Sequence, residues 1–210
     1  KTPCPDLEFN VISNLMIDTT RFKNQIYKIK NLVARRKLKR FDLTASIDCF
    51  GDEQEYVRYG LNLDTWKTNF EFLANEKWIV LHINQTFSGL TIKTSADMLA
   101  WVFRFRKDDR EIGHYFSTTV MTYDFLHPGI FGPGFFDKDF ESMYHTMSDQ
   151  GWYKHSFNYL DGIQKSINSM PRDQEKISQL IVYLDEIDRR RNTNWKKTFP
   201  WLEQEANHVV

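Results

Sequence analysis

Cysteine is scarce in this 210-residue sequence, in which only Cys4 and Cys49 are present. Two thiols support neither a framework of disulfides nor a zinc or iron–sulfur site built from cysteines alone. Long apolar runs are also missing, since the longest, Met98 to Phe103, is far short of the roughly 20 residues that a membrane span needs. These absences favour a soluble protein of the reducing cytoplasm that has no membrane partner.

An excess of charge is the next thing the sequence lacks, because 28 Lys and Arg residues balance 28 Asp and Glu residues. The chain as a whole therefore gives no electrostatic reason to bind nucleic acid. The basic run from Arg35 to Arg40 is short and is more typical of a solvated helix end. The sequence begins at Lys1 with no apolar signal segment, which predicts either a removed start or a fragment.

Short strand patterns alternate with helical patterns along the first two thirds of the chain. Strands are expected at Leu7–Asn14, Phe41–Asp48, Trp78–Thr86 and Phe116–Tyr123, and helices at Thr19–Val33, from Asp64 onward and at Ser95–Arg106. The Pro and Gly residues of 126–137 break any regular element, and the remainder reads as helices, the last at Arg172–Arg190. This order predicts an α/β fold with about four parallel βα units, because such helices are long enough for crossovers.

The strand patterns also indicate what kind of sheet this is. In the second strand Phe41, Leu43 and Ala45 alternate with polar residues, whereas strands covered on both faces read as continuous apolar runs. A partial (β/α) barrel with a polar concave face fits this pattern, and an antiparallel sheet with one solvated face is the alternative. The length and composition allow one substantial core or two small ones. We expect a barrel core over 1–136 and a helical C-terminal extension over 137–210.

Two segments resemble one enzyme family. The stretch "ASIDCFGDEQEYVRYG", from Ala45 to Gly60, and the C-terminal "YLDEIDRRRNTNWKKTFPWL" are similar to the fourth-strand region and the ending of radical S-adenosylmethionine (radical SAM) enzymes of the twitch-domain-containing branch. The resemblance covers nearly the whole chain. It implies a partial TIM barrel that binds S-adenosylmethionine at the carboxyl ends of its strands.

The resemblance also implies ligands for that cofactor. Ser46 and Arg58, twelve residues apart as in the family motif, correspond to residues that contact S-adenosylmethionine. A guanidinium fork suits the carboxylate of the cofactor, and a Ser or Asp side chain suits its ribose hydroxyls. Asp48 and Asn84, at neighbouring strand ends, are weaker candidates, and Asn14 is weaker still.

Each candidate also has a purely structural interpretation. Ser46 and Asp48 are residue types that bond to loop amides, and Arg58 has Glu53 and Glu55 nearby as surface partners. His82 alone among the histidines faces the expected concave side, where it is more typical of a hydrogen-bonded wall residue than of a base.

The chain departs from the family at its defining feature. The C-x-x-x-C-x-x-C loop that ligates a [4Fe–4S] cluster is absent, and Cys49 stands where glycine usually follows S-I-D. If Leu7–Asn14 is the third strand of the family, the first two βα units precede Lys1. No metal ligand or catalytic residue can then be named in this sequence.

Two functions stay open. In the first, the chain is the C-terminal portion of a radical SAM enzyme, whose complete form makes a 5′-deoxyadenosyl radical that abstracts hydrogen from a peptide or small-molecule substrate. In the second, it is a cluster-free degenerate or split binding module without catalysis of its own. Either one could complete its barrel with a missing N-terminal segment or a separate chain, leaving an exposed apolar edge here.

Overall fold

The structure is a computed structural model that describes residues 6–106, 110–117, 123–149 and 154–207. It divides the chain into two compact units, each built from three separate segments. The first comprises Lys1–Ile47, Gly60–Gln85 and Trp101–Tyr115, and the second comprises Asp48–Tyr59, Thr86–Ala100 and Phe116–Val210. Within the described ranges, no helix combines the length and the apolar character that crossing a membrane requires.

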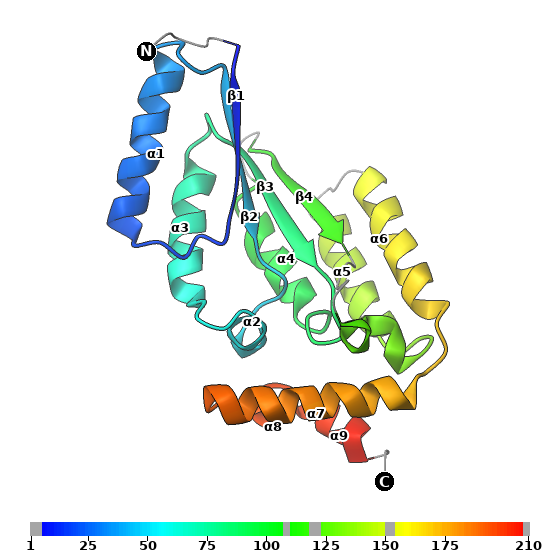
Figure 1. The fold of residues 1–210 in the computed structure, drawn as a ribbon. Coiled ribbons are helices and arrows are strands. Elements are labelled where there is room, and N and C mark those ends of the chain that lie inside the picture. Colours follow the sequence, from blue (N-terminus) through cyan, green and yellow to red (C-terminus); the bar gives the residue numbers. More distant parts are fainter. Residues whose placement is uncertain (1–5, 107–109, 118–122, 150–153, 208–210) are drawn as a thin grey trace. The chain divides into compact units, whose positions relative to one another are not determined.

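A four-stranded sheet carries the fold, and its strands lie in the order in which they occur along the chain (Figure 1). The strands are β1 (Glu8–Ser13), β2 (Arg40–Ser46), β3 (Val80–Thr86) and β4 (Ile112–Ser117). The helices α1 (Thr19–Ala34), α3 (Leu63–Asn75) and α4 (Ser95–Phe103) connect consecutive strands. The printed ladders, β1 with β2 and β2 with β3, are parallel, and β4 points the same way in Figure 1. The predicted α/β fold with parallel strands is confirmed.

Helix α1 begins at Thr19, where the sequence predicts it. The Asp18 carboxylate accepts a hydrogen bond from the amide of Arg21 at 2.9 Å, which satisfies one of the free donors of the first turn. Phe22 and Ile26 are its buried residues, one turn apart on one face. The helix therefore covers the apolar side of β2, whose Phe41 is also fully buried.

Helix α3 forms most of the remaining core of the first unit. The rings of Trp66 and Phe70 stack at 4.8 Å between centroids, and Trp101 packs against both. The fully buried Asn69 uses its side-chain nitrogen to donate to two carbonyls of the loop after β1, each at 2.9 Å. Large aromatic burial of this kind supplies much of the driving force for folding.

The second unit is predominantly helical, as expected for the end of the chain. Its elements are α2 (Asp52–Val57), two short 3₁₀ helices η1 (Asp124–Leu126) and η2 (Pro128–Phe131), α5 (Asp137–Asp149), α6 (Lys154–Asn168), α7 (Gln174–Arg191), α8 (Trp195–Thr198) and α9 (Pro200–Asn207). Helix α7 buries Ile177, Leu180 and Leu184 and ends at Asn192, whose φ of 54° is a left-handed cap. Three arginines occupy its last turn, where the helix dipole favours positive charge.

Several predicted boundaries were wrong. Strand β4 begins at Ile112 rather than Phe116, because Gly113 lies within the strand and does not interrupt it. Residues 118–122 of the predicted strand, like Cys4, lie outside the described residues. The segment around Pro128 forms η2, so its Pro and Gly residues do not exclude a regular element. Helix α2 lies within the Ala45–Gly60 stretch, where no helical spacing of apolar residues predicts a helix.

The polar side of β2 is less exposed than its sequence suggests. Asp42 is 9% exposed and Ser46 is 8% exposed, and Asp48, just beyond the strand, is also 8% exposed. The expected wet face is therefore polar but largely covered at these positions. Burying these groups requires hydrogen-bond partners, and these partners define the local structure described next.

Candidate functional site

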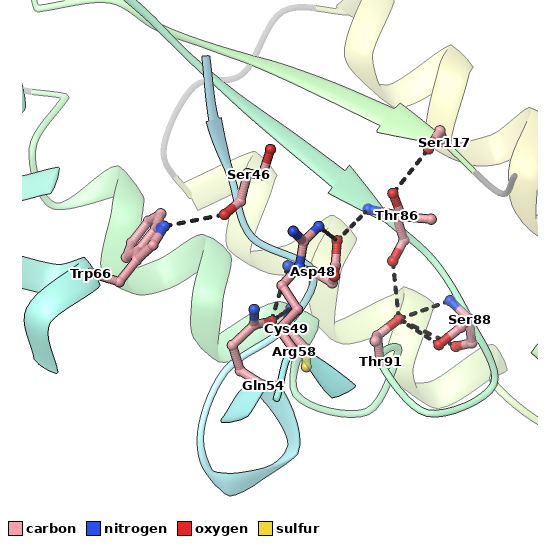
Figure 2. A network of polar contacts seen from close by, with 10 residues as sticks. All are labelled: Ser46, Asp48, Cys49, Gln54, Arg58, Trp66, Thr86, Ser88, Thr91 and Ser117. Carbon is pink, nitrogen blue, oxygen red and sulfur yellow. Dashed lines mark hydrogen bonds and ion pairs between the residues drawn. The ribbon is translucent and has the colours of Figure 1, made fainter. Parts of the chain in front are cut away.

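Asp48 and Arg58 form a two-pronged ion pair in the second unit, immediately after β2. Arg58 donates from Nε to Oδ2 of Asp48 at 2.5 Å and from Nη2 to Oδ1 at 2.9 Å, and the amide of Thr86 donates to the same Oδ1 at 3.2 Å (Figure 2). This hydrogen bonding raises the pKa of Arg58, so the guanidinium stays charged. The surface pairing of Arg58 with Glu53 or Glu55 that the sequence also allowed is not its ion pair here.

A buried glutamine fixes the backbone that carries Asp48. Gln54, in α2, is fully buried, and its side-chain oxygen accepts from the amides of Asp48 at 3.1 Å and of Cys49 at 2.8 Å. These two bonds close the turn that follows β2 and orient the Asp48 carboxylate toward Arg58. Sequence reasoning missed Gln54, because a polar residue in a short helix carries no pattern that distinguishes it from a surface residue.

Cys49 is packed rather than reactive. Its side chain is fully buried, and desolvation raises the pKa of its thiol, with the neighbouring Asp48 charge acting in the same direction. A thiolate is the form that ligates iron and attacks electrophiles, and this environment disfavours it. The described residues contain no group of three His, Cys, Asp or Glu side chains that could hold a metal ion. They therefore do not fit an iron–sulfur cluster.

The other three candidates belong to the first unit. Ser46 and Asn84 are directly paired across β2 and β3, and the backbone is closed there by a bond from the amide of Ile47 to the carbonyl of Asn84 at 3.1 Å. Trp66 donates from its indole nitrogen to the carbonyl of Ser46 at 3.1 Å (Figure 2). That bond anchors the backbone of Ser46 and leaves its hydroxyl unused by any bond the structure gives.

Asn14 has a local structural role. It is exposed beyond the end of β1, and its side-chain oxygen accepts from the amide of Met16 at 3.1 Å. This is a turn in which an asparagine side chain bonds the backbone two residues on, a common reason for asparagine at such a position. The structure thus brings Asp48 to Arg58 in one unit and Ser46 to Asn84 in the other, and gives Asn14 a bond within its own loop.

Hydroxyl groups shape the loop that follows β3 in the second unit. The hydroxyl of Ser117 donates to that of Thr86 at 3.3 Å, and Thr91 donates to the carbonyl of Thr86 at 3.2 Å. The amide of Ser88 in turn donates to the hydroxyl of Thr91 at 2.8 Å (Figure 2). Thr86, whose amide donates to Asp48, is therefore fixed through its carbonyl by Thr91 and through its hydroxyl by Ser117.

Comparison with known proteins adds no assignment to this geometry. No protein-family model matches the chain, and the curated proteins and solved structures searched contain no match either. The interpretation of the site therefore depends on its own residues and contacts.

Proposed function

We propose that this chain binds S-adenosylmethionine through the loop that follows β2, as the C-terminal portion of a radical SAM enzyme. The observation that supports this most directly is the fork between Arg58 and Asp48 at the carboxyl end of a strand in a parallel sheet. Ligands of open α/β sheets bind outside the carboxyl ends of the strands. The partial barrel that the resemblance implies is part of this proposal.

The fork leaves Arg58 able to contact a further anion. Its Nε and Nη2 are used by Asp48, and no described residue accepts a bond from its Nη1. About a third of the Arg58 side chain is exposed. The amino-acid carboxylate of the cofactor suits this remaining edge of the guanidinium, and a carboxylate such as Asp48 suits a ribose hydroxyl. Ser46, Asn84 and Asn14 stay candidates on the strength of the resemblance.

Radical chemistry is not assigned to the described residues themselves, since they do not fit the cluster that such chemistry requires. In the complete protein a [4Fe–4S] cluster held elsewhere would supply the electron that cleaves S-adenosylmethionine. The role of this chain is then to bind and orient the cofactor next to a peptide or small-molecule substrate.

Calorimetric titration of S-adenosylmethionine into the chain tests the proposal. Arg58→Lys keeps the charge beside Asp48 but loses the fork, so we expect it to weaken binding about tenfold or more. Arg189→Lys is the matched control, because Arg189 is an exposed arginine of α7 that also makes a two-pronged pair, with Glu186. Thermal melts of both variants separate lost binding from lost folding. Absence of binding to the unaltered chain, or equal binding by both variants, would refute the assignment.

A second candidate function is an interaction module without catalysis, and the edge of the sheet favours it. Strand β1 lies at the end of the strand order, with Leu7, Phe9 and Ile12 exposed by 50%, 41% and 74%. A groove of about 470 Å³, lined mainly by apolar residues of β1, α1 and β2, lies beside it. Exposed edges with apolar side chains add further strands. The occupant in this proposal is a strand of another chain, and a second copy of this chain can supply it.

Sedimentation over a range of concentrations tests this second function. We expect the chain to associate through β1, and Ile12→Lys to keep it monomeric by placing a charge on the edge. Val182→Lys is the matched control, because Val182 is 69% exposed on α7, far from β1 in the sequence and in the other unit. A monodisperse monomer at every concentration contradicts the proposal.

A further inference from the structure

Three neighbouring strands of the first unit bring Asp42, His82 and Tyr115 to one side of the sheet. The partner of His82 across β2 is Thr44, two residues after Asp42 and therefore on the same face. The His82 and Tyr115 rings lie 5.1 Å apart at an angle of 35°. Tyr115 is 53% exposed, so one face of this aromatic pair is open to solvent.

A glycine makes room for the imidazole. A Cβ atom at Gly113 would clash with Nδ1 of His82 and would lie 2.9 Å from its Cε1. The imidazole therefore rests on bare backbone of β4, between the neighbouring strand and the ring of Tyr115. Its position is set by packing rather than by a hydrogen bond from Nδ1.

Two polar atoms of this cluster lack a hydrogen bond. Oδ1 of Asp42 and Nδ1 of His82 are buried, and no described residue bonds to either. An unsatisfied buried polar atom costs about 1–3 kcal/mol, so each of these atoms is expected to have a partner such as a water molecule or a ligand. Nδ1 faces Gly113 in this orientation, and a half-turn of the ring about the Cβ–Cγ bond, which exchanges Nδ1 with Cδ2, would present it to a ligand on the open side.

The charges of the cluster restrict the ligand. Oδ2 of Asp42 accepts from Arg40 at 2.6 Å, and Arg40 and Lys39 also pair with Glu8, so the cations at this edge are already neutralised. Desolvation lowers the pKa of His82, which keeps the imidazole neutral near pH 7. Arg110, whose charge also acts on His82, is buried and donates to the carbonyls of Ile79 and Leu73. The exposed cations Lys39 and Arg40 are paired with carboxylates, so they do not favour an anionic ligand.

We propose that this side of the sheet binds an uncharged ligand that carries neighbouring hydrogen-bond donors beside a flat apolar face. The donors bond to Asp42 and His82, and the apolar face stacks on Tyr115. Sugar hydroxyls and peptide amides both have this chemistry. The site lies within the first unit and uses none of the residues proposed for the cofactor.

NMR titration of the full chain with three probes tests the proposal. Methyl β-glucoside and N-acetyl-alanyl-alanine methylamide represent the two sources of donors, and inorganic phosphate represents anions. We expect one of the two neutral probes to shift the side-chain signals of His82 and Tyr115 in a saturable way. The probe that does so identifies whether the ligand is sugar-like or peptide-like.

Three variants locate the binding. His82→Phe keeps a ring on Gly113 but removes both nitrogens, and Tyr115→Leu removes the stacking face, so each should weaken binding about tenfold or more. Tyr159→Leu is the control, since Tyr159 is equally exposed, at 53%, on α6. The proposal is overturned if neither neutral probe shifts these signals at millimolar concentration, if phosphate alone binds, or if His82→Phe and Tyr115→Leu bind as the control does.

Discussion

Replacing Gly113 with alanine tests how closely His82 packs on the sheet. The new methyl group must displace the imidazole, and such overpacking costs about 1–3 kcal/mol. Gly113 is not among the glycines with positive φ, so alanine adds no backbone strain and recovers about 0.5–1 kcal/mol relative to glycine in a strand. We therefore expect Gly113→Ala to lower the free energy of unfolding by about 1–2 kcal/mol.

A second substitution separates the clash from any other effect. In a His82→Ala background the obstacle is gone, so Gly113→Ala should become neutral or stabilising by about 0.5–1 kcal/mol. The coupling between the two sites is then about 2 kcal/mol. Gly162→Ala is the control, because Gly162 lies inside α6 with nothing within 4 Å of a Cβ, and alanine there should stabilise the helix.

Urea unfolding followed by circular dichroism measures all four proteins and the control. Equal slopes against urea are required, since a changed slope indicates a changed unfolded or native state. If Gly113→Ala lowers the free energy of unfolding by less than about 0.5 kcal/mol, or by the same amount without His82 as with it, the imidazole does not pack against Gly113 as described.

Three further outcomes follow from buried groups. Asn69→Ala should lower the free energy of unfolding by about 2–4 kcal/mol in urea melts, because two carbonyls of the Leu15 loop lose their donor; a loss under 1 kcal/mol would contradict this. Cys49 should react slowly with a thiol reagent as long as Gln54 holds the turn that buries it. In a Cys4→Ser background, which leaves Cys49 as the one thiol of the chain, Gln54→Ala should therefore speed this reaction. An unchanged reaction rate would argue against the role of Gln54 in closing the turn. Burial lowers the pKa of His114 to about 3, so the unfolded chain alone takes up this proton as pH falls from about 6.5 toward 3. The free energy of unfolding should fall across that window by up to about 1.4 kcal/mol per pH unit. In His114→Leu it should fall less steeply with pH, which urea melts at several pH values would measure. The same dependence on pH in both proteins would refute the assignment to His114.

The order and direction of the strands could be predicted from the sequence because they depend on patterns that repeat along the chain. Apolar residues at every second position mark β2, and a helical stripe beginning near Phe22 marks α1. Boundaries that depend on single residues failed. The predicted start of the fourth strand, Phe116, was wrong, since β4 begins at Ile112 and includes Gly113, where the imidazole of His82 takes the place of the side chain that glycine lacks.

The candidate site was predictable only in part. Asp48 and Arg58 could be named from the resemblance of their segment to a family motif. No sequence pattern predicts that they bind each other, because this depends on how α2 reverses the direction of the chain between them. Gln54, which fixes that turn, looks like a surface residue in the sequence. The sequence singles out His82 by its place in the strand but gives no sign of its packing against Tyr115. Pairings between distant residues are set by tertiary structure, which local patterns do not contain.

The interleaving of the two units has a consequence for how the protein is made. Segment 48–59 of the second unit is synthesised long before the segment that starts at Phe116, whereas the first unit lacks its last segment until Tyr115 has emerged. Neither unit can be expressed as one continuous fragment. Folding during synthesis must therefore wait for contacts between distant parts of the chain, which slows it and lengthens the time during which the apolar residues of early segments are exposed.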